Sequence, residues 1–163
     1  QRGETMNADI RPAVAADAGP IAALLREMGW FAAFQAETES QSQERVGRHL
    51  AQCLADASHS LFVAENEAGE LVGYMAIHWL PYLMLAGPEG YVSELFIRAD
   101  SRGQGLGRRL LEVAKAEAKQ RNCIRLSLLN VRERESYQRG FYRKAGWEER
   151  PQIVNFVYWL DPH

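Results

Sequence analysis

The stretch Arg102-Gly103-Gln104-Gly105-Leu106-Gly107-Arg108-Arg109 decides how this chain of 163 residues is interpreted. It follows a strand-like run at residues 91–98 and opens an amphipathic helix predicted over residues 105–121. A helix N-terminus carries unpaired backbone N–H groups and a partial positive charge. Glycines let an anion approach that backbone, and the arginines add cationic donors. The stretch therefore predicts a binding site for a diphosphate.

Three kinds of phosphate-binding loop compete for this stretch. A P-loop needs a Gly-Lys pair followed by Ser or Thr, and this chain has no such pair there. A dinucleotide fingerprint needs a third glycine where Arg108 stands, and it follows the first strand of its fold, whereas helices and several strands precede this loop. The third kind has the spacing Arg-x-x-Gly-x-Gly, which Arg102, Gly105 and Gly107 satisfy.

The hydrophobic pattern along the rest of the chain predicts an α/β sandwich with a mixed sheet. Alternating or apolar runs predict strands at residues 8–14, 60–64, 71–79, 91–98, 123–129 and 153–160. Helical periodicity predicts helices at residues 17–28, 41–57, 105–121 and 133–145. Asn66-Glu67-Ala68-Gly69 predicts a hairpin turn, and residues 81–90, with two prolines and two glycines, predict an exposed loop.

Composition narrows the class of protein. A net charge of −2 disfavours a general nucleic-acid binder, and no apolar run is long enough to span a membrane. We expect one domain over residues 6–163, preceded by a tag remnant or disordered tail at residues 1–5. Cys53 and Cys123 lack metal-site spacing, so we expect free thiols in a reducing cytoplasm and no metal. The four histidines, His49, His59, His78 and His163, are scattered without ligand spacing.

Two motifs together resemble the GNAT superfamily of acetyl-CoA-dependent N-acetyltransferases. The run Leu95-Phe96-Ile97-Arg98-Ala99-Asp100-Ser101-Arg102-Gly103-Gln104-Gly105-Leu106-Gly107 looks like its strand–loop–helix element. Phe141-Tyr142-Arg143-Lys144-Ala145-Gly146-Trp147 is similar to its late helix, and the order of elements from residue 8 onward also fits. The resemblance implies a GNAT-like acyl-CoA N-acyltransferase fold, with a mixed, mostly antiparallel sheet, helices on both faces and a splay between the two central strands.

The resemblance also implies acetyl-CoA as co-substrate and assigns the residues that hold it. The backbone of Leu95, Phe96 and Ile97 matches the strand that pairs with the pantetheine arm. The pyrophosphate loop matches seven consecutive residues: Arg102, Gly103, Gln104, Gly105, Leu106, Gly107 and Arg108. Many members carry an asparagine seven residues before the tyrosine; this chain has Glu135 there, and Asn130 is a candidate substitute.

An amine acceptor must lose a proton before it attacks, which costs about 4–5 kcal/mol at pH 7 for an alkylamine. Glu94 precedes the Leu-Phe-Ile segment, and strand alternation places it on the face of Val92 and Phe96. We interpret Glu94 either as the general base or as a binder of the substrate ammonium. The resemblance makes Tyr142 the general acid that protonates the departing thiolate, and a phenol with a pKa near 10 keeps its proton for that task.

We therefore expect transfer of acetyl from acetyl-CoA to a primary amine by direct attack in a ternary complex. Cys123, in a buried strand without a histidine partner, is a poor nucleophile for a covalent route. The alternatives are a non-catalytic acyl-CoA-binding sensor or regulatory domain of the same fold, and a nucleotide-binding switch.

The acceptor is open between a small-molecule amine and a protein amine, with no nucleic-acid or membrane partner. The aromatic residues expected to form its pocket, or else ordinary core and loop contacts, are Trp30, Phe31, Phe34, Trp79 and Tyr82. The resemblance further suggests a homodimer, for which residues 79–85 offer a surface, and we expect a cytoplasmic protein.

Overall fold

The computed structural model describes residues 7–161. The chain divides into two compact units, the first ending at Leu129 and the second starting at Asn130. Residues 1–5, expected to be a tag remnant or tail, lie outside the described residues. The single domain expected over residues 6–163 stays a prediction.

The first unit contains a mixed sheet of five strands in sequence order. The strands are β1 (Asp9–Pro12), β2 (His59–Glu65), β3 (Leu71–Leu80), β4 (Glu89–Ile97) and β5 (Arg125–Leu128). The first four pair antiparallel, and β5 pairs parallel to β4. The predicted turn joins β2 to β3: the Asn66 side chain accepts hydrogen bonds from the backbone N–H groups of Ala68 and Glu70, and Gly69 takes φ +76°.

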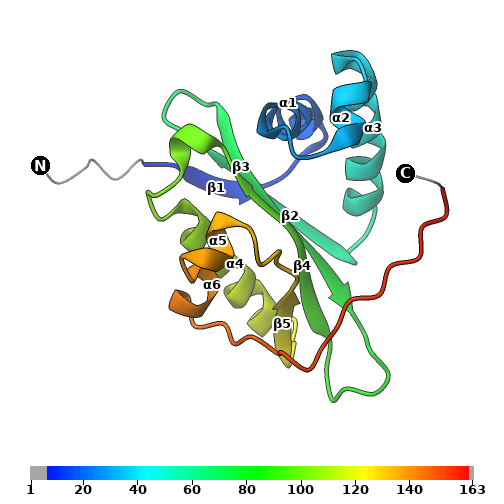
Figure 1. Cartoon of the computed structure of the whole chain (residues 1–163), viewed down its shortest axis with the longest axis vertical. Helices are drawn as coiled ribbons and strands as arrows, with labels where there is room; N and C mark the ends of the chain where they lie inside the picture. Colours follow the sequence, from blue (N-terminus) through cyan, green and yellow to red (C-terminus); the bar gives the residue numbers. More distant parts are fainter. Residues whose placement is uncertain (1–6, 162–163) are drawn as a thin grey trace, which may run out of the picture. The chain divides into compact units, whose positions relative to one another are not determined.

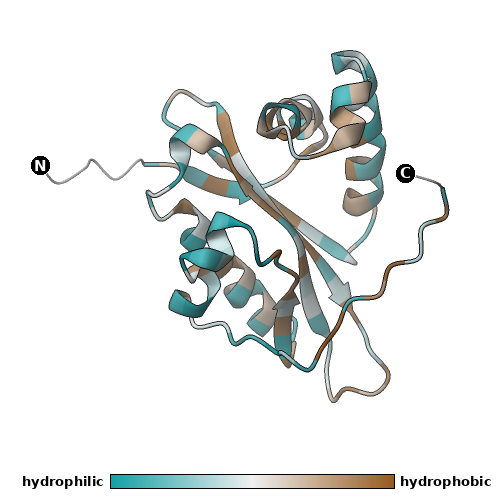
Figure 2. Ribbon diagram, viewed as in Figure 1, coloured by the Kyte–Doolittle hydropathy of each residue, from teal (hydrophilic) through white to brown (hydrophobic). Residues whose placement is uncertain are grey.

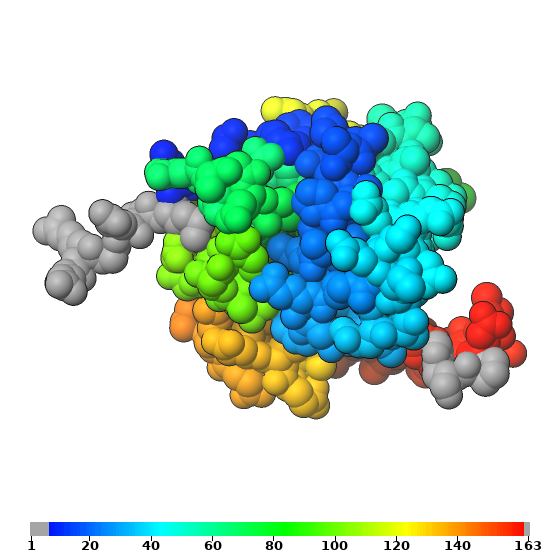
Figure 3. Space-filling view, turned by 90° about the horizontal axis from the view of Figure 1, so that it is seen from above, coloured from blue at the N-terminus to red at the C-terminus, as the bar shows by residue number. Residues whose placement is uncertain are grey.

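Helices cover both faces of this sheet (Figure 1). One face carries α1 (Ala18–Met28), α2 (Ala32–Ala36) and α3 (Glu39–Leu54), and the other carries α4 (Leu106–Gln120). Seen from above in Figure 3, α1 in blue and α3 in cyan lie side by side. Short 3-10 turns, η1 (Ala15–Asp17) and η2 (Ala99–Ser101), precede α1 and α4. The mixed, mostly antiparallel sheet between two helical layers confirms the expected fold class.

Local signals explain where the helices of the first unit begin and end. Gly29, with φ +70°, ends α1 at the position where the sequence predicts the stop. Thr38 and Gln41 form a capping box that begins α3, because each side chain bonds the other's backbone N–H. The five-residue α2 was not predicted, since it is too short to show a helical period.

Two apolar layers enclose the sheet. Leu61, Val63 and Tyr74 are buried against α1 and α3, whereas Leu110 and Leu111 of α4 are fully buried on the other face. In Figure 2, α3 alternates between teal and brown, as expected for a helix with one apolar face. Each such side chain contributes roughly 1.5–3 kcal/mol by leaving water, which fixes the sheet between its helices.

The β4–β5 pairing covers only the first part of β4. It runs from Glu89 opposite Arg125 to Val92 opposite Leu128 and stops there. β4 continues to Ile97 against β3 alone. This opening confirms the predicted splay of β4 from β5, although in the described residues β5 is the edge strand of the sheet and not a central one.

The closed end of this pairing is fastened by a buried carboxylate. Glu89, 5% exposed, accepts a hydrogen bond from Arg125 Nε at 2.7 Å and another from the Ser127 hydroxyl. Both partners lie on β5, so Glu89 fastens β5 to the first residue of β4. A buried carboxylate with a guanidinium and a hydroxyl partner avoids the cost of an unpaired charge.

The second unit differs from the prediction in two places. The single helix expected over residues 133–145 is two four-residue helices, α5 (Glu135–Gln138) and α6 (Phe141–Lys144). Gly140 separates them because its φ of +66° lies outside the helical region. The strand expected over residues 153–160 is absent. In the described part of the chain this segment has no partner strand, and its large side chains are exposed, Phe156 to 90%.

Candidate active site

The glycine loop lies between the open end of β4 and the start of α4. Gly103 and Gly105 take φ of +75° and +79°, where glycine is favoured, and Gly105 is the N-cap of α4. Apart from each glycine and its two chain neighbours, no atom of residues 7–161 lies within 4 Å of the position that a Cβ would occupy there. The exposed backbone N–H groups at the start of α4 and the room above these glycines fit a pyrophosphate group.

The other residues predicted to hold the cofactor surround this loop. Leu106 is buried against Val72, and Phe96 is buried on the opposite face, so only their backbone groups are available to a ligand. Ile97 is half-buried and its carbonyl accepts a hydrogen bond from Arg102 Nε at 2.9 Å. Arg108 is exposed at the start of α4.

Three further predicted positions complete this region. Leu95 is half-buried on β4, beyond the last residue that pairs with β5. Gln104 is half-buried in the loop, with its amide nitrogen 3.5 Å from the Asp100 carbonyl oxygen. Gly107, also half-buried, stands in the first turn of α4. The first unit therefore brings all ten predicted cofactor positions together at the open end of β4 and the start of α4.

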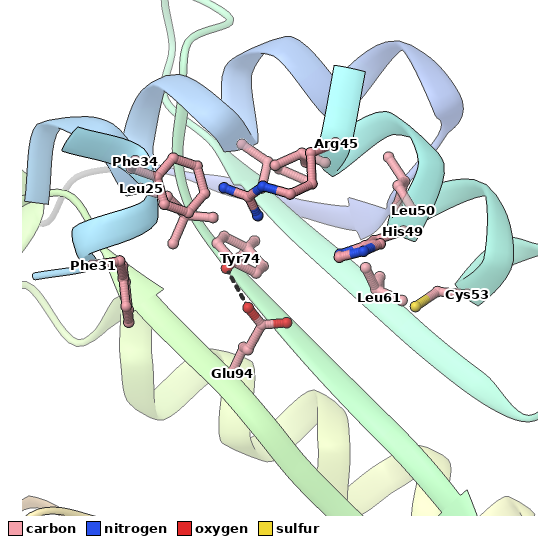
Figure 4. Close-up of a pocket in the computed structure, with 12 residues that line it drawn as sticks. Leu25, Phe31, Phe34, Arg45, His49, Leu50, Cys53, Leu61, Tyr74 and Glu94 are labelled. Atoms are coloured by element: carbon pink, nitrogen blue, oxygen red, sulfur yellow. Dashed lines mark hydrogen bonds between the residues drawn. The ribbon is translucent and has the colours of Figure 1, made fainter. Parts of the chain in front are cut away.

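A pocket lies between the sheet and the first three helices (Figure 4). Its wall combines apolar side chains with five polar or ionisable ones, three from α3, one from β3 and one from β4. The lining residues are Ile21, Leu25, Phe31, Phe34, Arg45, Val46, His49, Leu50, Cys53, Leu61, Tyr74 and Glu94. A small-molecule site is typically such an apolar pocket with a few convergent polar groups.

Glu94 lies on the wall of this pocket and has one side-chain partner there. The Tyr74 hydroxyl donates a hydrogen bond to Glu94 Oε1 at 2.9 Å, drawn as the dashed line in Figure 4. Burial and the negative charge of Glu94 raise the pKa of Tyr74 well above 10. Tyr74 therefore keeps its proton and stays a donor, which orients the carboxylate in the pocket.

A β-bulge decides that Glu94 points into the pocket. Glu94 pairs with Ala76 and Val92 pairs with Ile77, so Ser93 is the extra residue on β4. Side chains of paired residues share a face. Glu94 therefore lies on the face of Phe96, as predicted, but the expectation that Val92 shares this face is wrong. The bulge reverses the alternation between them.

The aromatic residues proposed for an acceptor pocket separate into two groups. Phe31 and Phe34 line the pocket, and the Phe31 ring packs edge-on against Phe96 at 5.5 Å. Trp79 and Tyr82 do not line it: the Trp79 indole donates to Ser60 Oγ at 2.9 Å, and Tyr82 stands in the exposed loop after β3.

Trp30 is not part of the pocket wall either, but it connects the pocket's edge to the glycine loop. Its ring lies 6.1 Å from that of Phe96 and 5.5 Å from the Arg102 guanidinium. An arginine at this distance from an indole makes a cation–π contact.

Sequence reasoning missed Tyr74, Arg45 and His49. The last two lie on α3, where Arg45, His49 and Cys53 follow at intervals of four residues and so share one helix face. Polar residues repeated every four positions beside the apolar stripe of a helix could have indicated that this face lines a pocket. Cys53 offers no nucleophile, because burial raises the pKa of its thiol.

In the second unit, Tyr142 lies on α6. Its ring packs edge-on against Phe141 at 4.9 Å and Trp147 at 6.2 Å, and burial raises the pKa of its phenol. Gly146, with φ +86°, lets the Trp147 N–H return to the Tyr142 carbonyl at 3.0 Å, which closes the helix end.

Glu135, at the position where many family members carry an asparagine, also lies in this unit. Glu135 is the exposed first residue of α5. The Asn130 amide instead exchanges hydrogen bonds with the Ser136 hydroxyl, at 3.2 and 3.3 Å. The Asn130 amide is thus already engaged within its own unit.

No helix in residues 7–161 is long and apolar enough to cross a membrane. Within that range no group of three or more His, Cys, Asp or Glu side chains is arranged to hold a metal ion.

Comparison with known proteins identifies the class. The sequence pattern of the acetyltransferase (GNAT) family matches residues 25–147. The chain is 30% identical to the L-methionine sulfoximine/L-methionine sulfone acetyltransferase of Pseudomonas paraeruginosa over 163 residues, 96% of this chain and 91% of that relative. It is 28% identical to an aminoglycoside N(6')-acetyltransferase type 1 of Stenotrophomonas maltophilia over 116 residues, 69% of this chain and 75% of that relative.

A solved structure agrees with the fold. An aminoglycoside acetyltransferase from an uncultured soil metagenomic sample, in complex with trehalose, superposes with a TM-score of 0.75 at 19% identity, covering 94% of this chain and 97% of that chain. Together these findings define an acetyltransferase. The chain belongs to the GNAT family, whose co-substrate is acetyl-CoA, and the resemblance carried by residues 95–107 and 141–147 is confirmed.

Proposed function

We propose that this acetyltransferase acetylates the primary amine of a small molecule by direct attack in a ternary complex. The observation that carries the proposal is the Glu94 carboxylate, held by Tyr74 on the wall of an apolar pocket at the open end of β4. That two relatives are named for small-molecule acceptors supports a small molecule over a protein amine.

The open strand and the glycine loop support a place for the cofactor. The backbone of Leu95 to Ile97, beyond the last β4–β5 pair, would hold the pantetheine arm as a neighbouring strand would. The N–H groups from Gly103 to Arg108 and the Arg102 guanidinium would hold the pyrophosphate. When bound, acetyl-CoA supplies the acetyl group as a thioester, whose C–S bond breaks as the amine nitrogen forms the amide C–N bond.

Glu94 supplies the basic or electrostatic function. As a base it takes the proton that the amine must lose, directly or through one water, and this is worth roughly 10²–10⁴-fold in rate. As an ammonium binder it holds the same nitrogen at the same carboxylate. The apolar wall around Glu94 strengthens either interaction because it excludes water.

Tyr142 supplies the proton for the leaving thiolate. Burial raises the pKa of this phenol, so at neutral pH it is protonated and available as a donor. An ammonium acceptor loses two protons in all. Glu94 takes the first before attack and passes it to solvent, and the second, lost as the amide forms, balances the proton that Tyr142 gives to the thiolate. The products are the N-acetyl amide, the free thiol of coenzyme A and one proton.

The test is a thiol-release assay with acetyl-CoA against a pooled library of small amines. We expect release with at least one amine. Tyr142→Phe should lower kcat by about 10²-fold while the Kd for acetyl-CoA, measured by calorimetry, stays within twofold. Tyr158→Phe, at an exposed tyrosine, is the matched control and should change neither.

The test also separates the alternatives. Binding of acetyl-CoA without transfer to any amine would favour the sensor or regulatory domain. Binding of ATP or NAD that coenzyme A does not displace would favour a nucleotide switch. The homodimer and the cytoplasmic location suggested by the resemblance stay predictions. Sedimentation velocity in an analytical ultracentrifuge tests whether the protein is a dimer.

A further inference from the structure

The pocket that holds Glu94 has a second charged group on its opposite wall. Arg45 reaches it from α3, above the Tyr74 ring in Figure 4, and Glu94 lies below that ring. The Arg45 side chain is 25% exposed, whereas Arg48, one turn further along α3, is 61% exposed. Arg45 is thus directed into the pocket wall, and Arg48 toward solvent.

Arg45 is fixed in place by two contacts. Its Nε and Nη2 donate to the two oxygens of Glu37, at 2.7 and 2.8 Å. Its guanidinium lies over the Phe34 ring, 4.5 Å from the ring centre. A guanidinium has five N–H donors, and those two bonds are the ones it makes to described residues. Its remaining donors are therefore available to a ligand in the pocket.

The charges on this side of the pocket sum to a positive value. The Arg45 hydrogen bonds hold the pKa of Glu37 at about 2, so Glu37 is ionised at neutral pH. Arg26 is a second guanidinium here, since its Nη2 donates to the Glu37 carbonyl at 2.9 Å and to Ser42 Oγ at 3.0 Å. Two guanidiniums and one carboxylate leave a net charge of +1 near Arg45, opposite the negative Glu94.

The space between the two charged groups is small and apolar. The cavity volume is about 160 Å³. An apolar cavity of about 150 Å³ holds a molecule of the size of benzene. The Tyr74 ring lies between Arg45 and Glu94 in Figure 4, and Leu25, Leu50 and Leu61 line the pocket beside it. An acceptor that satisfies this pocket has an ammonium group, an anionic group and a compact apolar part.

We propose that Arg45 is a specificity-determining residue that binds the carboxylate of an amino acid acceptor whose amine lies at Glu94. The proposal rests on the proposed function and narrows its acceptor to zwitterionic amino acids with a small apolar side chain. A polyamine would place further positive charge against Arg45 and Arg26, and an amine without an anionic group would leave the Arg45 donors unpaired.

The test compares L-leucine with two amines of nearly the same shape, L-leucinamide and 3-methylbutylamine, and with spermidine. Steady-state kinetics with saturating acetyl-CoA should give kcat/KM for L-leucine at least tenfold above the value for each of the other three. Charge-assisted hydrogen bonds of this kind discriminate by about 10- to 100-fold.

Variants of α3 supply the control. Arg45→Met should raise KM for L-leucine by about 10- to 100-fold and leave KM for 3-methylbutylamine within twofold. Arg48→Met removes an arginine from the same helix and should change neither. Arg45→Lys keeps the charge and should recover part of the L-leucine affinity, measured also as L-leucine binding by calorimetry without acetyl-CoA.

The outcomes distinguish the two proposals. If 3-methylbutylamine or spermidine is acetylated as efficiently as L-leucine, or if Arg45→Met weakens L-leucine and 3-methylbutylamine equally, the role of Arg45 is wrong and the proposed function stands. If none of these nor any library amine releases thiol, the proposed function fails instead.

Discussion

The two ends of β4 differ in what they pair with. At the closed end, Glu89 to Val92 pair with β5, and the buried Glu89 bonds Arg125 and Ser127. At the open end, beyond Ser93, β3 is the one strand that pairs with β4 among residues 7–161, and the carboxylate there, Glu94, faces the pocket. One strand thus carries two half-buried or buried carboxylates, one bonded for stability and one directed at a ligand site.

The largest effect is expected from neutralising the carboxylate at the open end. Glu94→Gln keeps the shape and the bond from Tyr74, so we expect kcat to fall by about 10²- to 10³-fold with an unchanged melting temperature if Glu94 is the base. A raised KM at unchanged kcat would identify it as the ammonium binder. Glu89→Gln is the matched control, with kcat within threefold. Wild-type kinetics in Glu94→Gln would contradict both roles.

At the closed end the expected effect is on stability. Arg125→Ala removes the cation from a buried carboxylate, and we expect the free energy of unfolding to fall by about 2–3 kcal/mol. Urea unfolding measures it, with kcat of the folded variant within threefold of wild type. A loss below about 0.5 kcal/mol, the range of surface substitutions, would show that Glu89 does not need this partner.

Substitutions in the glycine loop test whether the open end of β4 binds the cofactor. Gly105→Ala and Gly69→Ala both place a Cβ at a φ near +80°, at +79° and +76°, with no neighbour within 4 Å. Each should cost about 1 kcal/mol of stability. Only Gly105→Ala should also weaken the Kd for acetyl-CoA, by about tenfold, since its methyl group stands where a phosphate approaches. Equal Kd values in the two variants would place the pyrophosphate elsewhere.

The smallest effect concerns alkaline pH. Burial and Glu94 raise the pKa of Tyr74 well above 10, its value in the unfolded chain. The protonated phenol is therefore favoured by folding, and this stability is complete below pH 10 and is lost as pH rises further. Between pH 9 and 11 the melting temperature of wild type should fall about 2–4 °C more than that of Tyr74→Phe. If the melting temperatures of wild type and Tyr74→Phe fell equally between pH 9 and 11, this prediction would be wrong.

The strands β1 to β5, the helices α1, α3 and α4, and the glycine loop could be predicted because their signals are local. Glycines at turns, a capping box and alternating apolar residues each act within a few positions of the chain. The splay was predicted from the resemblance alone, since no local pattern marks where β5 stops pairing with β4.

The pocket could not be predicted in the same way. The bulge at Ser93 is one extra residue in an otherwise regular alternation, so it reversed the face assigned to Val92. Tyr74 and Arg45 reach Glu94's pocket from β3 and α3, and only the tertiary fold brings these elements together. The segment 153–160 has strand-like residues, but a strand also needs a partner, which composition does not supply.

The contact between Arg102 and Trp30 has a practical consequence. A guanidinium 5.5 Å from an indole ring perturbs the excited state of that ring. When a diphosphate draws Arg102 away, the emission of Trp30 should change in wavelength or intensity. Intrinsic tryptophan fluorescence would then report coenzyme binding without any label, and Trp30→Phe would abolish the change in emission.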